Sequence, residues 1–417
     1  MHFQNILFSL IFLLASVQLN AQENYTLKEA LKYAKENSPY LKAAHINIAM
    51  GEAEITTAKL RPNLNLTNES IQVINSKHFP DNATWRHGEN REIFWELSKP
   101  LQLAGQRRHK IDFAKKNLSS IEKTYSETER NLFLEVANKW LELWTVEKQL
   151  EILQIAKANI DSLSFINQKR FESEVISKTE LQRTELLSKQ YEIQYEIMQK
   201  EVSNEKKELA LLLGFENEIS IDTADNFLIS IPQGIKELIA QSIENRSDMQ
   251  LAKSVIELSN SNLKLQKASA YPETELGMIY NPQGAVPFLG FSFSIDLPVF
   301  NRNQGEIRRA YLEIDQAEQE IQMLEREIKT EVAIAYSDYK LHEQNLEKFK
   351  ELLQQSAVIL ESVKQSYLRG GTNIIDFLEA QRSWLEIQQE HYDALQTFKQ
   401  SYVRMLYTTG LINQLAL

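Results

Sequence analysis

The sequence predicts an α+β fold in which one unit, a β-hairpin followed by a pair of very long helices, is built twice. Alternating apolar residues end twice in a proline, a polar turn and an Arg-Arg pair, at residues 107–108 and 308–309. Each pair lies in a stretch of at least 64 residues without glycine or proline, although the chain has 12 Gly and 9 Pro. Because glycine and proline interrupt helices, each pair is expected to open a long helix.

The two turns between strand and helix share their residue types. Each combines a proline, a glycine and paired arginines, so each marks the point where a strand passes into a helix. The arginines are equally compatible with an ordinary charged first helical turn. The first turn contains Pro100, Gly105, Arg107 and Arg108, and the second contains Pro298, Asn301, Arg302, Asn303, Gly305, Arg308 and Arg309.

The duplication divides the chain into two structural repeats. The first spans residues 22–214, with a hairpin at 63–99 and a long helix pair at 105–214. A linker at 215–233 leads to the second repeat, 234–410, with a hairpin at 272–298, a helix pair at 304–410 and a tail at 411–417. Each repeat begins with a helix. The first of these, over residues 26–61, starts with a capping box of Thr26 and Glu29.

The second hairpin shows the clearest strand pattern. Its apolar residues, Thr274, Leu276, Met278 and Tyr280 and then Phe291, Phe293, Ile295 and Leu297, alternate with small or polar ones. Such a pattern is typical of strands between lipid and a water-filled lumen. It also fits a half-buried strand of a soluble sandwich. An export signal and the lack of strands for a second sheet favour the membrane interpretation.

Heptad spacing predicts that the long helices pair as in coiled coils. One series recurs every seven residues, at Tyr339, Leu346, Leu353, Leu360 and Tyr367. Each long helix is expected to reverse direction once, near residues 170–182 and 368–379. The second reversal contains a Gly-Gly pair and the first contains no glycine.

Composition excludes several classes of function. The net charge of −11 and the absence of a Lys/Arg block argue against nucleic-acid binding. Absence of cysteine excludes disulfides, thiolate metal sites and a lipidated N-terminal cysteine. No nucleophile motif, phosphate loop or close set of metal ligands is present, so we predict neither an enzyme nor a bound cofactor.

The first 21 residues read as a secretory signal peptide. Their apolar run, Ile6 to Leu19, is too short to span a bilayer and precedes Asn20-Ala21. No later segment is apolar enough for a transmembrane helix, so a membrane crossing would have to use strands. Four strands cannot close a barrel, and several copies would have to combine, two giving eight strands and three giving twelve.

This order of elements resembles the TolC-like outer-membrane efflux protein family over nearly the whole mature chain. The two turn motifs are most similar to its heavy-metal branch, the CzcC-like and CusC-like proteins. The resemblance implies a homotrimer with a 12-stranded β-barrel in the outer membrane and a 12-helix tunnel in the periplasm. It also implies two partners, a periplasmic adaptor and an inner-membrane pump of the resistance-nodulation-division type. Conduction through the channel would be passive.

The resemblance also implies where the periplasmic aperture lies. A family pattern of acidic residues after the second reversal matches Gly371, Thr372, Asp376 and, in its last place, Glu379. At the first reversal Thr179 and Glu180 match contacts that hold the tip closed, while Tyr367 lies one position before the family's tyrosine. Adaptor-contacting tips would include Arg170, Phe171, Gly370, Gly371 and Thr372. Glu172 and Glu174 are further candidates for the acidic aperture, and Glu174 stands where the family usually has glycine.

Ordinary structural roles could also explain these acidic residues and two histidines. Acidic residues are favoured at any helix N-terminus by the macrodipole, and acidic turn residues are commonly just solvated. His78 and His87, in the long loop of the first hairpin, could bind zinc or copper, but their nine-residue separation matches no compact metal site.

Two rival functions remain at this stage. Within the channel class, the cargo could be an organic compound or an exported protein, as in type I export, in place of a metal ion. From another class, a secreted or periplasmic coiled-coil structural or adaptor protein would share the long helices. That protein would be soluble without detergent, whereas the channel would not.

Overall fold

The computed structural model describes residues 24–416, except 86, 226, 228–233 and 283–285. The expected signal peptide, 1–21, and part of the expected linker lie outside the described residues. Two compact units are present. Unit 1 comprises Met1–Ala43, Glu127–Arg246 and Arg326–Leu417, and unit 2 comprises Ala44–Ser126 and Ser247–Glu325. Each unit therefore takes segments from both sequence repeats.

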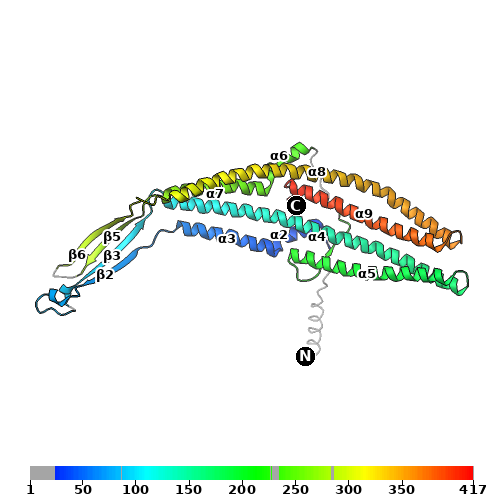
Figure 1. Ribbon diagram of the computed structural model, residues 1–417, viewed down its shortest axis with the longest axis horizontal. Helices are drawn as coiled ribbons and strands as arrows, with labels where there is room; N and C mark the ends of the chain where they lie inside the picture. Colours follow the sequence, from blue (N-terminus) through cyan, green and yellow to red (C-terminus); the bar gives the residue numbers. More distant parts are fainter. Residues whose placement is uncertain (1–23, 86, 226, 228–233, 283–285, 417) are drawn as a thin grey trace, which may run out of the picture. The chain divides into compact units, whose positions relative to one another are not determined.

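Unit 2 contains a four-stranded antiparallel sheet (Figure 1). Its strands are β2 (Asn65–Gln72), β3 (Arg91–Leu101), β5 (Thr274–Asn281) and β6 (Phe288–Ile295), in the order β2-β3-β5-β6. β3 pairs with β5, for example Leu97 with Met278, so the hairpins of the two repeats join in one sheet. Short 3-10 turns, η1 (Ser76–His78) and η2 (Gly88–Asn90), lie in the β2–β3 loop.

The sheet has an apolar face and a polar face, as the alternation predicts. Directly paired residues share a face, and Met278 pairs with Phe291, both exposed. On the other face Ser98 Oγ donates to Glu275 Oε1 at 2.6 Å, and the Ser292 hydroxyl donates to Glu96. A Cβ at Gly277 would collide with this second pair, so a larger residue there would displace the Ser292–Glu96 hydrogen bond.

The alternation fails in β2. Asn68 pairs with Trp95 and Ser70 with Ile93, which brings two polar side chains onto the apolar face of the sheet. The sequence pattern in this strand is correspondingly weak after Leu66.

The helices that open each repeat are interrupted. The single helix predicted over residues 26–61 is wrong, because Pro39 starts a second helix: α2 is Leu27–Asn37 and α3 is Pro39–Lys59. In the second repeat α6 (Ile235–Asn245) and α7 (Ser247–Ser269) are divided in the same way. The predicted capping box is confirmed, with Glu29 N donating to Thr26 Oγ1 at 3.2 Å and Thr26 N donating to Glu29 Oε2 at 2.9 Å.

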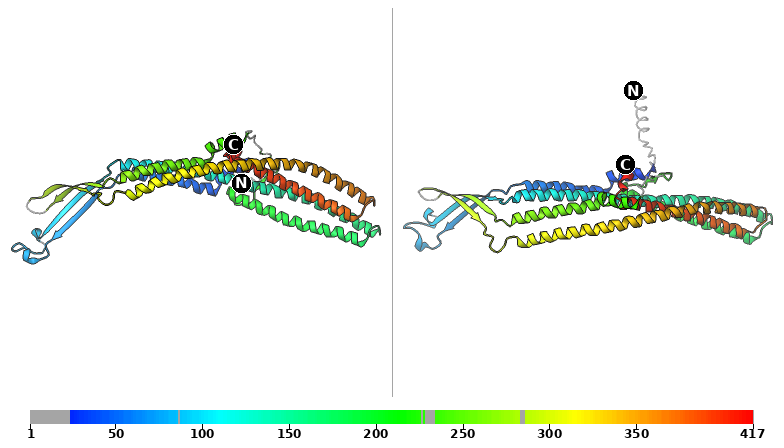
Figure 2. Two further views of the ribbon diagram at one scale, coloured as in Figure 1. Left: turned by 45° about the horizontal axis from the view of Figure 1, so that its top comes forward. Right: turned by 90° about the horizontal axis from the view of Figure 1, so that it is seen from above.

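Four long helices account for nearly half of the chain and confirm the predicted fold class. They are α4 (Gln106–Glu172), α5 (Lys178–Leu213), α8 (Gln304–Leu368) and α9 (Ile374–Thr408). In unit 2, α3, α4, α7 and α8 run side by side, and in unit 1 α4 lies beside α5 and α8 beside α9 (Figure 2). The described helices include none that is both long and apolar enough to cross a membrane.

The two strand-to-helix turns differ in the residue that takes the left-handed conformation. Before α4, Ala104 and Gly105 have φ of +51° and +72°. Before α8, Asn303 has φ of +57°, and the expected turn glycine, Gly305, is already the second residue of the helix. Asparagine tolerates this conformation, and Asn303 Nδ2 donates to the Gln266 carbonyl oxygen at 2.8 Å.

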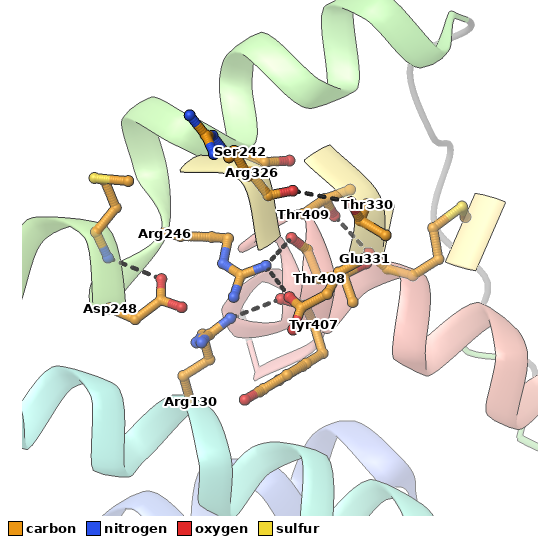
Figure 3. Close-up of polar contacts among 12 residues, drawn as sticks. Arg130, Ser242, Arg246, Asp248, Arg326, Thr330, Glu331, Tyr407, Thr408 and Thr409 are labelled. Carbon is orange, nitrogen blue, oxygen red and sulfur yellow. Dashed lines mark hydrogen bonds and ion pairs between the residues drawn. The ribbon is translucent and has the colours of Figure 1, made fainter. Parts of the chain in front are cut away.

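Two buried arginines hold the C-terminal end of α9 in unit 1 (Figure 3). Arg130 Nη1 donates to the Tyr407 carbonyl oxygen at 3.0 Å, and Arg246 Nη1 donates to that of Thr408 at 3.1 Å. Arg246 also pairs with Glu331 at 2.6 Å. Cations at this end of a helix satisfy its last carbonyls and oppose its dipole, so both contacts stabilise the terminus.

A further cation of unit 1, Lys399 on α9, is buried among aromatic rings. Lys399 is only 7% exposed, and its Nζ lies 3.8 Å from the centre of the Trp144 ring and 5.4 Å from that of the Phe227 ring. Burial lowers the pKa of Lys399 from its ordinary 10.5 to about 8; Asp225 opposes this shift and Lys148 adds to it. The folded chain therefore carries a desolvated ammonium at neutral pH.

Lys399→Met is expected to raise the free energy of unfolding at pH 7 by about 2 kcal/mol, because desolvation of a charge is relieved at the loss of one cation–π contact. Between the folded pKa of about 8 and the ordinary 10.5, the unfolded wild type binds the proton and the folded one does not. Lys399 therefore makes wild-type stability rise with pH in that window. Thermal unfolding of wild type and variant from pH 7 to 10.5 should converge, and Lys189→Met, at an exposed site on α5, should show no such convergence.

Candidate functional site at the helix reversals

Unit 1 contains both helix reversals, and we call residues 170–180 and 367–379 the tip. At the first reversal, between α4 and α5, Val175 N donates to the Arg170 carbonyl oxygen at 2.8 Å and Glu174 N to that of Phe171 at 2.9 Å. These two bonds form a Schellman motif, whose first residue after the helix adopts the left-handed conformation. That residue is Glu174, with φ of +59°.

The second reversal, between α8 and α9, is built in the same way. Gly371 N donates to the Ser366 carbonyl oxygen at 2.8 Å and Gly370 N to that of Tyr367 at 3.0 Å. Gly370, with φ of +76°, occupies the place that Glu174 has in the first reversal. The duplication thus extends to the hydrogen bonds of both turns.

Exchanging the residue types of these two positions is expected to move stability in opposite directions. A non-glycine residue in the left-handed region costs roughly 1–2 kcal/mol, so Glu174→Gly should stabilise the first reversal by about 1 kcal/mol. Gly370→Glu should destabilise the second by a similar amount. Hydrogen exchange of the amides of Val175 and Gly371 measures both effects, and equal exchange in wild type and variants would contradict the assignment.

The returning helices start with equivalent caps. Ser177 caps α5, with Glu180 N donating to Ser177 Oγ at 3.2 Å and Ser177 N donating to Glu180 Oε2 at 2.9 Å. Asn373 caps α9, accepting from Asp376 N at 3.0 Å, and Asp376 accepts a hydrogen bond from the Thr372 hydroxyl. Glu180 and Asp376 therefore occupy equivalent positions in the two repeats. The carboxylate of Glu180 accepts its hydrogen bond from the backbone of its own cap residue, Ser177.

Behind the turns, a buried polar network joins three helices. Asn167 of α4, with no exposed surface, donates from Nδ2 to Thr184 Oγ1 of α5 at 2.9 Å. The Tyr367 hydroxyl of α8 donates to Asn167 Oδ1 at 3.0 Å, and Thr184 in turn donates to the Glu180 carbonyl oxygen. Sequence reasoning missed Asn167 and Thr184. The signal was the heptad that includes Val146, Leu153 and Ile160, since Asn167 is its next member.

An apolar cluster surrounds this network. It contains Leu153, Ala156, Ile160, Leu163, Leu187, Tyr191, Leu360, Tyr367, Ile374, Phe377, Leu378 and Leu385. The Tyr367 ring stacks on Phe377 with centroids 5.9 Å apart. The Arg170 guanidinium lies 5.0 Å from the centre of the same Tyr367 ring. All four long helices contribute, so the tip is packed within one chain.

The predicted aperture residues divide into exposed and internal ones. Glu172, Glu174, Thr179, Asp376 and Glu379 have exposed side chains. Glu172 is paired with Lys169 at 2.9 Å, and its pKa is lowered by this hydrogen bond and a second one from Gln168. Tyr367 is 2% exposed and Glu180 forms the cap, so these two act inside the chain.

Basic residues that the sequence reading did not single out accompany Glu379. A groove between α5 and α9 is lined by Arg183, Leu186, Ile375, Leu378, Glu379, Arg382, Ser383 and Glu386. Arg183 and Arg382 thus partly balance Glu379 and Glu386. Asp376 lies nearer the turn and is not part of this groove.

The histidine loop forms no compact site. His78 and His87 are exposed, and His87 Nδ1 accepts a hydrogen bond from Glu89 N at 3.4 Å, which gives this ring a capping role in η2. Across the described part of the chain, no group of three or more His, Cys, Asp or Glu residues is arranged to hold a metal ion.

Comparison with known families decides the class of this chain. Residues 30–215 and 238–411 match the family model described as outer membrane efflux protein. The chain belongs to the outer membrane efflux protein family. The family resemblance predicted from the turn motifs and the duplication is thereby confirmed, and the family consists of outer-membrane channels, not enzymes. Membership places this efflux protein at the outer membrane of a Gram-negative cell.

The curated relatives have low sequence identity to this chain, but their alignments cover most of it. The pyoverdine export outer membrane protein OpmQ of Pseudomonas putida is 21% identical over 386 residues, covering 87% of this efflux protein and 81% of OpmQ. The toluene efflux pump outer membrane protein TtgC of Pseudomonas putida is 23% identical over 310 residues, covering 69% of this chain and 62% of TtgC. The chain therefore spans less than two thirds of TtgC.

Solved structures share the fold of this efflux protein. A crystal structure of CusC superposes with a TM-score of 0.76 at 18% identity, covering 95% of both chains. The CmeC outer membrane channel of Campylobacter jejuni gives a TM-score of 0.75 at 18% identity, covering 95% of this chain and 90% of CmeC. At these identities the likeness shows the fold alone.

Proposed function

We propose that this protein is the passive outer-membrane channel of a tripartite efflux system, with heavy-metal cations as its cargo. Three copies would bring twelve strands together in one closed barrel and would continue the ring with their long helices. A closed barrel satisfies the unpaired edges of β2 and β6, which a single chain leaves open in lipid. The periplasmic partners would be an adaptor, held at the tip, and a resistance-nodulation-division pump that supplies the energy.

The single observation that carries this proposal is the exposure of Asp376 and Glu379 just after the second reversal. They are three residues apart on α9 and so share one side of the helix. Three copies would place six carboxylates around one opening. Such a ring attracts cations and resists close packing by mutual repulsion, as a gate that opens on demand requires.

Organic cargo is the second candidate, because the curated relatives are named for pyoverdine export and toluene efflux. The heavy-metal candidate draws on the similarity of the two strand-to-helix turns to the metal branch of the family. A channel of this kind need not select what its pump selects, so the cargo is best tested in the cell.

Deletion of the gene, with complementation by the wild type, separates the two candidates. Heavy-metal efflux predicts growth inhibition by zinc, cobalt, cadmium or copper at concentrations the parent strain tolerates, with antibiotic and solvent tolerance unchanged. The reverse pattern would support organic cargo and overturn the metal assignment. Unchanged sensitivity to both groups in a strain shown to express the protein would contradict an efflux role.

A further inference from the structure

A pocket in unit 2 gathers positive charge from two helices. It is lined by residues 107–109, 111, 112 and 115 of α4 and by Lys264 of α7. Its volume of ≈ 530 Å³ is within the range of small-ligand sites. Four of these seven residues are Lys or Arg, and Asp112 is the one acid. The chain as a whole carries a net charge of −11, so this cluster runs against the overall balance.

Three of the four cations of this pocket form no ion pair with a described carboxylate. Arg107 donates from Nε and Nη2 to the Lys59 carbonyl oxygen, at 3.1 and 2.6 Å, and so closes the C-terminal end of α3. The carboxylate of Asp112 accepts from Ser261 Oγ at 2.7 Å. Within the described residues, no carboxylate forms an ion pair with Arg108, Lys115 or Lys264. Neighbouring cations are paired, Lys116 with Glu257 and Arg309 with Glu313.

Unpaired like charges that face one pocket raise its affinity for an anion. Arginine binds phosphate oxygens through two parallel N–H donors, and lysine adds a point charge. Arg108, Lys115 and Lys264 are exposed and available for such contacts. The chemistry of the pocket therefore fits a phosphate group.

The pocket lies just beyond the ends of the strands. β3 ends at Leu101 and α4 begins at Gln106, so the pocket occupies the first three turns of α4, roughly 15 Å along the helix. Gln106 Nε2 donates to the carbonyl oxygens of Ala268 and Tyr271, which fixes α4 beside the end of α7. The head-group layer of a bilayer extends about 5–8 Å beyond its hydrocarbon core, which matches the strand-side part of the pocket. Side chains of α4 tilt toward the N-terminal end of the helix, and therefore toward that layer.

Exposed apolar side chains lie close in sequence to the strand-side end of the pocket. Leu103 is 39% exposed and Tyr271 is 58% exposed, and both belong to the short segments between strand and helix. An acyl chain next to these residues would place its own phosphate close to the first turns of α4. A free phosphate ion would gain nothing from them.

We propose that this pocket binds the phosphate of a phospholipid head group in the leaflet that adjoins the helices. The bound lipid fixes the height of the protein in the membrane through Arg108, Lys115 and Lys264. The inference uses the outer-membrane placement of the family and does not depend on which cargo the channel conducts.

Native mass spectrometry of the detergent-purified protein with added phosphatidylglycerol tests this proposal. Each removed cation is expected to weaken lipid binding about fivefold, so the triple variant R108Q/K115Q/K264Q should bind roughly 100-fold more weakly than wild type. The charge-matched control K178Q/K189Q/K200Q changes exposed lysines of α5 and should bind as wild type does. The oligomer mass in the same spectra shows whether the variants keep their assembly.

A second arm separates the lipid from a free anion. Inorganic phosphate in excess should displace little of the bound lipid, because it lacks the acyl contacts with Leu103 and Tyr271. Equal lipid binding by wild type and R108Q/K115Q/K264Q would overturn the proposal. Displacement of the lipid by inorganic phosphate at equal concentration would overturn the lipid assignment as well.

Discussion

Asn167→Ala is expected to lower the local free energy of unfolding of the tip by about 3 kcal/mol. The substitution removes two buried hydrogen bonds, leaves the Tyr367 hydroxyl without its acceptor and opens a cavity between α4, α5 and α8. Thr184 keeps its bond to the Glu180 carbonyl oxygen, so the loss falls mainly on the second reversal. Amides near Gly370 should lose roughly 100-fold of their protection against hydrogen exchange.

The matched control is Asn159→Ala, a half-buried asparagine about two turns earlier on the same helix. It removes the same side chain without a buried partner and should leave protection at the tip unchanged. Tyr367→Phe removes one of the two bonds and should fall between wild type and Asn167→Ala. Equal protection in Asn167→Ala and Asn159→Ala would show that the network does not hold the tip together.

Neutralising Asp376 and Glu379 of α9 is expected to weaken block of the channel by cations. Asp376→Asn together with Glu379→Gln keeps side-chain size and removes six charges from a trimer. Block by a multivalent cation added to the periplasmic side should weaken by at least tenfold, about 1.4 kcal/mol. The conductance of single channels in planar bilayers, with and without cobalt hexammine, measures this change.

Charge-matched substitutions elsewhere provide the control for that experiment. Glu185 and Glu196 are exposed on α5, away from the reversals, and Glu185→Gln with Glu196→Gln removes the same number of charges. This control should leave cation block as in wild type. If both double variants respond alike, Asp376 and Glu379 do not line the opening.

Local sequence patterns predict the helices of this fold, but not all of their ends and turns. Long gaps between Gly and Pro predict the four long helices because helix breaking is local. The end of the first short helix was missed because Pro39 lies inside an otherwise periodic segment. The left-handed conformation of Glu174 could not be foreseen from its residue type, although the two reversals share one set of hydrogen bonds.

The positions of the candidate site residues in the fold could be predicted near the turns, but not inside the helix bundle. Asp376 and Glu379 lie at the start of α9, as expected, because the Gly370-Gly371 turn fixes where that helix begins. The network of Asn167, Thr184 and Tyr367 depends on three helices that meet only in the folded chain. The cationic pocket likewise needs Lys264 beside α4, although the stretch from Ser98 to Ile121 already has six Lys or Arg and one acid.

The mass and solubility of the native particle test the central claim of an outer-membrane channel most directly. The protein expressed from its full-length gene should fractionate with outer membranes, require detergent for extraction, and give a native mass of three chains. In planar bilayers that particle should form ion-conducting pores. Recovery of the protein as a detergent-free soluble monomer would contradict the channel and favour a periplasmic coiled-coil protein.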